Sequence, residues 1–211
     1  MRTDAEFWTK NALRYAGNKI KDMESYEYTL GRTRSYLKPE EKVLEVGCGT
    51  GSTALLLAPS VAHITASDFA EGMLDIGREK ARDQGVTNIT FANVDVAAPE
   101  HEQTYDAILG FNLFHLVKDT DRAFADIHKN LKPGGMFISK TPCLAQRGLG
   151  LKFGLLKLVI PLMQLVGQAP FVKMLTIEEL EAAVTAAGFE IIESGNFPAT
   201  PPARYLVARR V

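Results

Sequence analysis

Cysteine is scarce in this chain of 211 residues, and its two cysteines, Cys48 and Cys143, lie far apart. Two separated cysteines cannot form the disulfide framework of a small secreted domain or a paired cysteine metal site. The four histidines also lack a spacing typical of metal ligands. These absences predict that the protein has no metal site, and they favour a reducing compartment. We therefore expect a cytoplasmic protein.

The chain also has no excess of basic over acidic residues. The chain has 24 Lys and Arg against 25 Asp and Glu, which gives a net charge of -1. Binding to a phosphate backbone relies on clustered cations, so we expect a small-molecule partner and no nucleic acid. The opening residues, MRTDAEFWTKNALRY, also lack the continuous apolar run and small-residue cleavage site of a secretory signal.

Short β-rich runs alternate with helical patterns along most of the chain. The runs are KVLEVG, HITASD, NITFANVDV, YDAILGFN, MFISKTP, FEIIESG and RYLVARRV. Parallel neighbouring strands can be joined only by a crossover, so this alternation predicts a Rossmann-like α/β fold with helices on both faces of a doubly wound, seven-stranded, mostly parallel sheet. The last two runs are separated only by NFPATPPA, which leaves no room for a helix and predicts an antiparallel last strand.

Two additions to this sheet are expected within a single domain that spans residues 1–211. Aromatic and apolar residues at helical spacing predict two helices before the first strand, packed at one end of the sheet, and these form a helical cap over residues 1–38. An apolar insertion over residues 145–174 follows the fifth strand.

A helix formed by this insertion would be apolar on nearly all sides. It must therefore be buried in the protein, packed against a second chain or inserted into lipid. Pro161 and Lys157 interrupt it, whereas a membrane span needs about 20 apolar residues. Three interpretations of residues 145–174 stay open at this point. The segment is a lid over an apolar acceptor pocket, a peripheral membrane contact, or the interface of a homodimer.

The stretch VLEVGCGTGS at residues 43–52 places glycines at alternate positions behind an apolar run. Gly47, Gly49 and Gly51 can adopt positive φ and carry no Cβ, so the backbone can turn into the next helix and touch a ligand directly. The first amide groups of that helix favour an anionic group of the ligand. The alternative interpretation is that these glycines only permit the turn.

Acidic residues follow the next two predicted strands. Asp68 lies 21 positions after Gly47, near the separation of about 20 at which an acidic side chain accepts from ribose hydroxyls. An N-cap role for the following helix would also explain an aspartate there. Asp95 closes the third strand, where it could accept from an exocyclic amine or simply occupy a turn.

The order VLEVGCGTG, ASDF, NVD, YDAILGFNLFHLV and LKPGGMF resembles the class I S-adenosylmethionine-dependent methyltransferases over about residues 40 to 140. The resemblance implies that the cofactor is S-adenosyl-L-methionine. It also implies the residues that bind this cofactor: Glu45, Gly47, Gly49 and Gly51, with the intervening Cys48, around the methionine moiety; Asp68 at the ribose; Phe69 and Met73 beside the adenine; Asp95 with Val96 at the adenine edge; and Asn112 near the transferred methyl group.

The acceptor is expected to be small. GFNLFHL has no proline, so it departs from the Asp/Asn-Pro-Pro-aromatic signature of the methyltransferases that act on amino groups of nucleobases. The segment from Phe111 to Gly135 looks most like the branch of the family that methylates quinone precursors, lipid head groups or small metabolites. Methyl transfer is an in-line displacement that depends on alignment, and a general base is optional.

His115 is the candidate catalytic residue, because it is the only histidine expected at the active end of the sheet and can act as a base near neutral pH. A purely structural role for His115 stays open. Tyr15, Tyr26 and Tyr28 are further candidates from the amino-terminal helices.

Two other functions fit the same sheet. An NAD-dependent oxidoreductase would carry G-x-G-x-x-G, whereas this chain has G-x-G-x-G followed by Ser52. The other alternative is a protein that binds S-adenosylmethionine or S-adenosylhomocysteine without transferring a methyl group.

Overall fold

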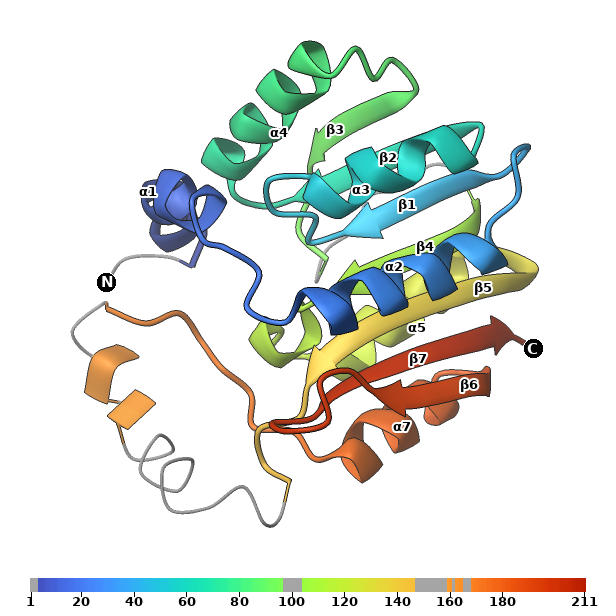
Figure 1. Ribbon diagram of the computed structural model, residues 1–211. Helices are drawn as coiled ribbons and strands as arrows, with labels where there is room; N and C mark the ends of the chain where they lie inside the picture. The colour runs from blue at the N-terminus through green and yellow to red at the C-terminus, as the bar shows by residue number, and fades with distance from the viewer. Residues whose placement is uncertain (1–3, 97–103, 147–158, 161, 165–167) are drawn as a thin grey trace.

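The computed structural model describes residues 4–96, 104–146, 159–160, 162–164 and 168–211. Its centre is a seven-stranded sheet in the order β3-β2-β1-β4-β5-β7-β6 (Figure 1). The strands are β1 (Lys42–Val46), β2 (His63–Asp68), β3 (Ile89–Asn93), β4 (Tyr105–Phe111), β5 (Leu131–Pro142), β6 (Phe189–Asn196) and β7 (Ala203–Arg210). β1 to β5 pair in parallel, and β7 is antiparallel to β5 and β6. The predicted fold and its antiparallel last strand are confirmed.

Helices cover both faces of this sheet. They are α1 (Asp4–Ala16), α2 (Met23–Tyr36), α3 (Ser52–Leu57), α4 (Glu71–Asp83), α5 (Thr120–Asn130) and α7 (Ile177–Ala186), with short 3-10 turns η1 (Ala58–Ser60) and η2 (Phe114–Leu116). α2, α3 and α4 lie on one face, and α5 and α7 lie on the other (Figure 1). This arrangement satisfies the requirement that parallel strands be joined by crossovers.

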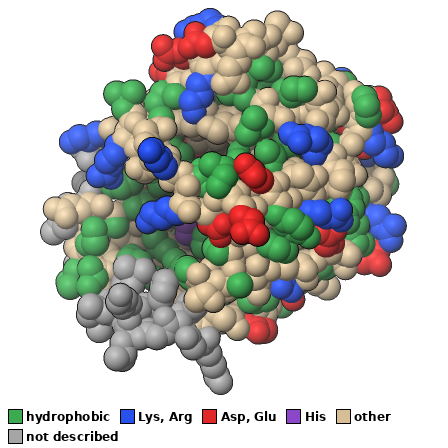
Figure 2. All heavy atoms as spheres, viewed as in Figure 1, with side chains coloured by type: hydrophobic (Ala, Val, Ile, Leu, Met, Phe, Trp, Pro, Cys, Tyr) green, Lys and Arg blue, Asp and Glu red, His purple; other side chains and the backbone are tan. Residues whose placement is uncertain are grey.

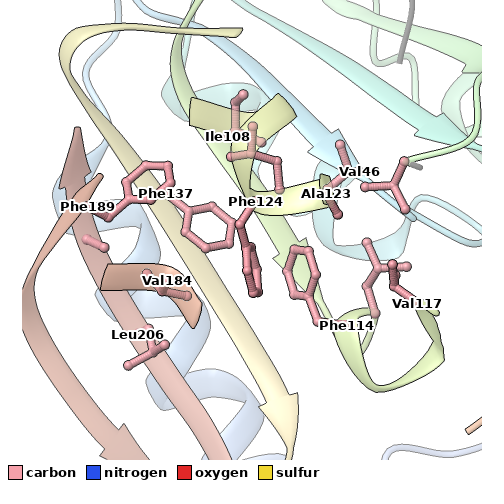
Figure 3. Close-up of a cluster of buried hydrophobic side chains, with 14 of the residues drawn as sticks. Val46, Ile108, Phe114, Val117, Ala123, Phe124, Phe137, Val184, Phe189 and Leu206 are labelled. Carbon is pink, nitrogen blue, oxygen red and sulfur yellow. The ribbon is translucent and has the colours of Figure 1, made fainter. Parts of the chain in front are cut away.

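The core consists of two apolar layers, one on each face of the sheet. Under α5 and α7, the rings of Phe114, Phe124 and Phe137 pack with centroids 4.8 to 5.8 Å apart (Figure 3). The opposite layer contains residues of β1, β4, β5 and β7 that point toward α2 and α3. Four successive residues of β1 are buried, as expected for a central parallel strand covered on both faces.

The two amino-terminal helices do not lie together at one end of the sheet, contrary to the sequence-based expectation. α1 lies at the carboxyl ends of the strands and packs against α4, where Ala12 joins Ala70 and Met73 in a small apolar cluster. α2 instead runs along a face of the sheet, and its buried Thr33 has its hydroxyl 3.3 Å from the hydroxyl of Tyr205 in β7. Because α2 buries residues against the sheet, α1 is the one of these two helices that lies over the strand ends.

Most of the predicted insertion lies outside the described residues. Residues 159–160 and 162–164 are helical, and residues 168–174 have no regular secondary structure. The lid, membrane-contact and dimer interpretations of residues 145–174 therefore stay predictions. No helix in the described ranges is both long enough and apolar enough to cross a membrane.

Candidate active site at the carboxyl ends of the strands

A cavity of about 790 Å³ opens where β1, β2 and β4 end. Its wall is built by α1, the turn between β1 and α3, the start of α4, η2 and residues 170–172. Figure 2 shows a hollow lined by hydrophobic side chains on the side of the molecule where α1 lies. The volume falls in the range of small-molecule sites, which occur at this edge of open α/β sheets.

The glycine turn presents bare backbone to the cavity. Gly47 and Gly49 both line it and have φ of 60° and 54°. A Cβ built on Gly49 would have only one neighbour, Cε1 of Tyr15 at 3.6 Å, so this position faces open space. A Cβ on Gly47 would lie 2.5 Å from the side chain of Leu113, another residue of the wall. The turn therefore lets a ligand approach the main chain most closely at Gly49.

Asp68 links this turn to the start of α4. Its Oδ2 accepts from the Gly49 N–H at 2.9 Å, and its Oδ1 accepts from the Ala70 N–H at 2.9 Å. The N-cap position of α4 is Ala70, so Asp68 is not the N-cap residue. Burial raises the pKa of Asp68, and the negative charge of Asp95 adds to the effect, while the backbone N–H groups oppose it. Each carboxylate oxygen can accept more than one hydrogen bond, so Asp68 keeps capacity for ligand hydroxyls.

Most of the predicted site residues meet at this cavity. The predicted residues that line it are Gly47, Gly49, Asp68, Phe69, Met73, Asp95, Val96, Asn112 and His115. Asn112 follows β4 with φ of 54°, and its backbone N–H donates to Lys140 O at 2.7 Å. Asparagine tolerates this left-handed conformation better than most residues, and such conformations cluster at functional sites. The individual roles of these residues stay predictions.

Three predicted cofactor-binding residues, Glu45, Cys48 and Gly51, do not line the cavity. Glu45 and Cys48 are buried in the protein interior. At Gly51, a Cβ would lie 2.7 Å from the ring of Phe91, so the glycine makes room for a core aromatic residue and begins α3 at φ 69°. The prediction that these three residues border the cofactor stays a prediction, and none of them faces this cavity. Packing accounts for the glycine at position 51.

Burial raises the pKa of Glu45 to about 8, and its Oε2 has no hydrogen-bond partner. Because the pKa in the folded state lies above that in the unfolded state, the folded state binds more protons between about pH 4.5 and 8. The stability that Glu45 contributes is therefore lost as pH rises through this window.

As pH rises from 5 to 8, we expect the free energy of unfolding of the wild-type protein to fall by roughly 3 kcal/mol more than that of Glu45→Gln. Urea denaturation of the ligand-free protein at both pH values measures this change. Glu27→Gln, at an exposed position of α2, is the matched control and should keep the wild-type dependence on pH. If Glu45→Gln also keeps it, Glu45 does not titrate in this window.

His115 lines the cavity beside the described end of the predicted insertion. Its backbone oxygen accepts from the Lys173 N–H at 2.6 Å, and its Nδ1 is buried without a hydrogen-bond partner. Burial lowers the pKa of His115 to about 4, so the imidazole is neutral at physiological pH. This pKa lies below the near-neutral value that the sequence-based hypothesis of a general base assumes.

His115→Gln should make stability less sensitive to acid. The unfolded state binds more protons than the folded state between about pH 6.5 and 4, so the contribution of His115 to stability is lost as pH falls through that range. We expect the wild-type protein to lose roughly 2 kcal/mol more than this variant between pH 7 and 5. Chemical denaturation at both pH values measures the difference. His63→Gln, whose ring contacts Thr90 far from the cavity, should behave as the wild type; an equal response of both variants would contradict the prediction.

Of the three candidate tyrosines, Tyr15 lines the cavity, whereas Tyr26 and Tyr28 do not. Trp8 and Phe171 are among the wall residues that were not predicted from the sequence. The ring of Trp8 packs edge-to-face on that of Tyr15, with centroids 5.9 Å apart. Phe171 lies on the wall near the amino terminus, and its backbone N–H donates to Asp4 Oδ1 at 3.4 Å. The seven-residue separation of Trp8 and Tyr15, two helical turns, was a usable signal for a shared face. No local pattern indicated that Phe171 lies beside α1.

Within the described ranges, no group of three or more His, Cys, Asp or Glu side chains is placed to hold a metal ion. The polar side chains around the cavity include four carboxylates, one amide, one imidazole and one ammonium group, from Asp4, Asp68, Asp95, Asp119, Asn112, His115 and Lys118. This set suits hydroxyl and amine groups of an organic ligand.

Residues 43–135 match the family model described as "Methyltransferase domain". A demethylmenaquinone methyltransferase of Clavibacter sepedonicus is 33% identical over 100 residues, which cover 46% of this chain and 40% of that protein. A malonyl-[acyl-carrier protein] O-methyltransferase of Bacillus anthracis is 32% identical over 129 residues, which cover 60% of this chain and 46% of that protein. The chain thus spans less than half the length of these curated relatives.

Solved structures resemble the chain over nearly its whole length. The magnesium protoporphyrin IX methyltransferase ChlM of Synechocystis PCC 6803, crystallised with SAH, has a TM-score of 0.72 at 19% identity and covers 96% of this chain and 94% of its own. The [4+2]-cyclase SpnF has a TM-score of 0.78 at 16% identity and covers 99% of this chain and 97% of its own. At these identities the likeness shows a shared fold.

Proposed function

We propose that this chain, which belongs to the class I S-adenosylmethionine-dependent methyltransferases through residues 43–135, transfers a methyl group to a small apolar acceptor. The observation that carries the proposal is the composition of the cavity wall. One part of the wall is bare glycine backbone with two carboxylates, and the rest is largely apolar. This division suits a polar cofactor beside an apolar acceptor.

The residues of the polar part fit S-adenosylmethionine, which supplies an electrophilic methyl group on a sulfonium. Gly49 leaves space against the main chain, and Asp68 keeps hydrogen-bond capacity for ribose hydroxyls. Phe69 and Met73 offer apolar surface at the start of α4, next to Asp68. Asp95 lies close enough to Asp68 to raise its pKa, so the two carboxylates concentrate negative charge at this end of the cavity.

The apolar part of the wall supports an acceptor of low polarity. Trp8, Leu113, Val117 and Phe171 contribute to it from three different segments. The name of one relative, a demethylmenaquinone methyltransferase, is consistent with such an acceptor. Walls of this kind exclude water and hold the reacting atoms in line, which supplies much of the rate of a displacement reaction.

We further propose that His115 takes part as a neutral hydrogen-bond acceptor for a hydroxyl or amine of the methyl acceptor. Its low pKa keeps the imidazole unprotonated above about pH 5. A cytoplasmic location is also part of the proposal, and the free thiols of the buried Cys48 and Cys143 support it.

Calorimetry with S-adenosylhomocysteine and with NAD tests the cofactor, and we expect binding of the first only. Transfer of label from S-adenosylmethionine to quinone precursors, lipid extracts and small metabolites then tests the activity and identifies the acceptor class. Binding of NAD in place of S-adenosylhomocysteine would overturn the proposal. Binding of S-adenosylhomocysteine without label transfer to any acceptor would favour the second candidate function, a cofactor-binding protein.

A further inference from the structure

A surface beside the cavity mouth plays no part in the proposed methyl transfer. It consists of one face of α1, the connection to α2 and the first residue of α2, and we call it the α1 loop surface: Lys10, Leu13, Arg14, Lys19, Ile20, Lys21 and Met23. Its apolar side chains are unusually exposed, with 81% of Leu13, 45% of Ile20 and 48% of Met23 accessible to solvent. Positions 10, 13 and 14 lie on one side of α1, because residues three and four apart are neighbours on a helix.

The charge of this surface departs from that of the whole chain. Residues 10–23, which span this surface, contain four cations and one carboxylate, Asp22, whereas the chain has 24 basic and 25 acidic residues. None of the four cations forms an ion pair with a described residue. The adjacent Asp22 caps α2 by accepting from the Ser25 N–H at 3.0 Å. Figure 2 shows Lys and Arg side chains beside hydrophobic ones over the place of α1.

Exposed apolar side chains between unpaired cations are typical of segments that lie in the interface of a bilayer. There the apolar side chains enter the boundary of the acyl chains, while Lys and Arg extend toward the head groups. Anionic lipids attract each nearby cation by about 1 kcal/mol, equivalent to about a fivefold gain in partitioning.

We propose that the α1 loop surface docks on an anionic lipid bilayer. Leu13, Ile20 and Met23 insert, and the cations contact lipid phosphates. Trp8 and Tyr15 of the same helix line the cavity, so docking would place the cavity mouth at the membrane. An apolar acceptor could then enter from the lipid, and this last step alone rests on the proposed function.

Sedimentation of the full chain with lipid vesicles tests docking without cofactor or acceptor, so it does not depend on the proposed function. We expect binding to vesicles of phosphatidylcholine mixed with phosphatidylglycerol, and little to phosphatidylcholine alone. Raising the salt to about 1 M, where the Debye length is about 3 Å, should release the protein. Lys19→Glu with Lys21→Glu should weaken binding at least about tenfold, because two attractive charges become repulsive.

The matched control reverses two exposed cations elsewhere, Arg82→Glu with Lys129→Glu, at the carboxyl ends of α4 and α5. This variant has the same net charge as the first and should keep vesicle binding within about twofold of the wild type, since its cations lie away from the membrane. Leu13→Gln with Ile20→Gln should also weaken binding, because insertion is lost. Calorimetry with S-adenosylhomocysteine on each variant confirms that its site is intact.

Three results would overturn the inference. The first is failure of the wild-type protein to sediment with anionic vesicles. The second is equal loss of binding in the two charge-reversal variants, which would mean that net charge and not this surface drives association. The third is a change of oligomeric state on Lys19→Glu with Lys21→Glu in sedimentation velocity without lipid, which would assign the surface to a second copy of the chain.

Discussion

Valine in place of Gly49 is expected to abolish binding of S-adenosylhomocysteine, with affinity falling at least about 100-fold, or about 3 kcal/mol. Gly49 has φ of 54°, a conformation that a β-branched residue adopts only with strain. The added side chain would also point into the cavity, where a Cβ would meet only Tyr15 Cε1 at 3.6 Å. The substitution would therefore fill the space through which the ligand reaches the backbone. Calorimetry measures the loss.

Gly85→Val separates these two effects. Gly85 has φ of 67°, and a Cβ there would meet no atom within 4 Å, so the same substitution adds backbone strain far from the cavity. We expect Gly85→Val to lower the melting temperature and to leave affinity for S-adenosylhomocysteine unchanged. An equal loss of affinity in both variants would mean that lower stability of the whole protein, and not the filled cavity, weakens binding. Full binding by Gly49→Val would mean that the ligand lies elsewhere.

Alanine in place of Asp68 is expected to weaken binding of S-adenosylhomocysteine by about 10- to 100-fold. Hydrogen bonds to a charged group contribute about 1.5 to 3 kcal/mol each, and the variant would lose those that the carboxylate makes to the ligand. It would also leave the N–H groups of Gly49 and Ala70 without their acceptor, which loosens the turn between β1 and α3. Both consequences lower affinity, and the second also lowers stability.

Asp22→Ala is the matched control for this prediction. Asp22 likewise accepts from a backbone N–H, that of Ser25 at 3.0 Å, but it caps α2 and does not line the cavity. Its loss should cost about 1 kcal/mol of stability and leave affinity unchanged. Unchanged affinity in Asp68→Ala would remove Asp68 from the ligand site. Asp68→Asn, which keeps one acceptor oxygen, should fall between Asp68→Ala and the wild type.

The strands, their mostly parallel pairing and the position of the glycine turn could be predicted from the sequence, because all three depend on local properties. Strand runs are recognisable by their apolar, β-branched composition, and the alternation with helices implies parallel pairing. Gly47 and Gly49 mark a turn that needs positive φ, and the end of β2 brings Asp68 to the same edge of the sheet. Nine predicted site residues accordingly line one cavity.

Which neighbours of this motif reach the cavity was decided only by tertiary packing. Gly51 belongs to the same glycine pattern, yet it accommodates the ring of Phe91 from β3. Glu45 lies within β1, where the packed helices bury its carboxyl and raise its pKa to about 8. A sequence pattern records spacing along the chain, whereas these outcomes depend on side chains contributed by other elements.

The other residues of the cavity wall could be identified only from the tertiary structure. Asp4 and Phe171 are 167 positions apart in sequence, yet a hydrogen bond joins them at the cavity. Burial also lowers the pKa of His115 to about 4, and the N–H of Lys173, which is distant in sequence, donates to its backbone oxygen. Local sequence thus determined the strands of the sheet and the glycine turn at its edge. Contacts between distant segments determined the shape, polarity and protonation of the rest of the cavity wall, because burial and desolvation arise only when those segments pack together.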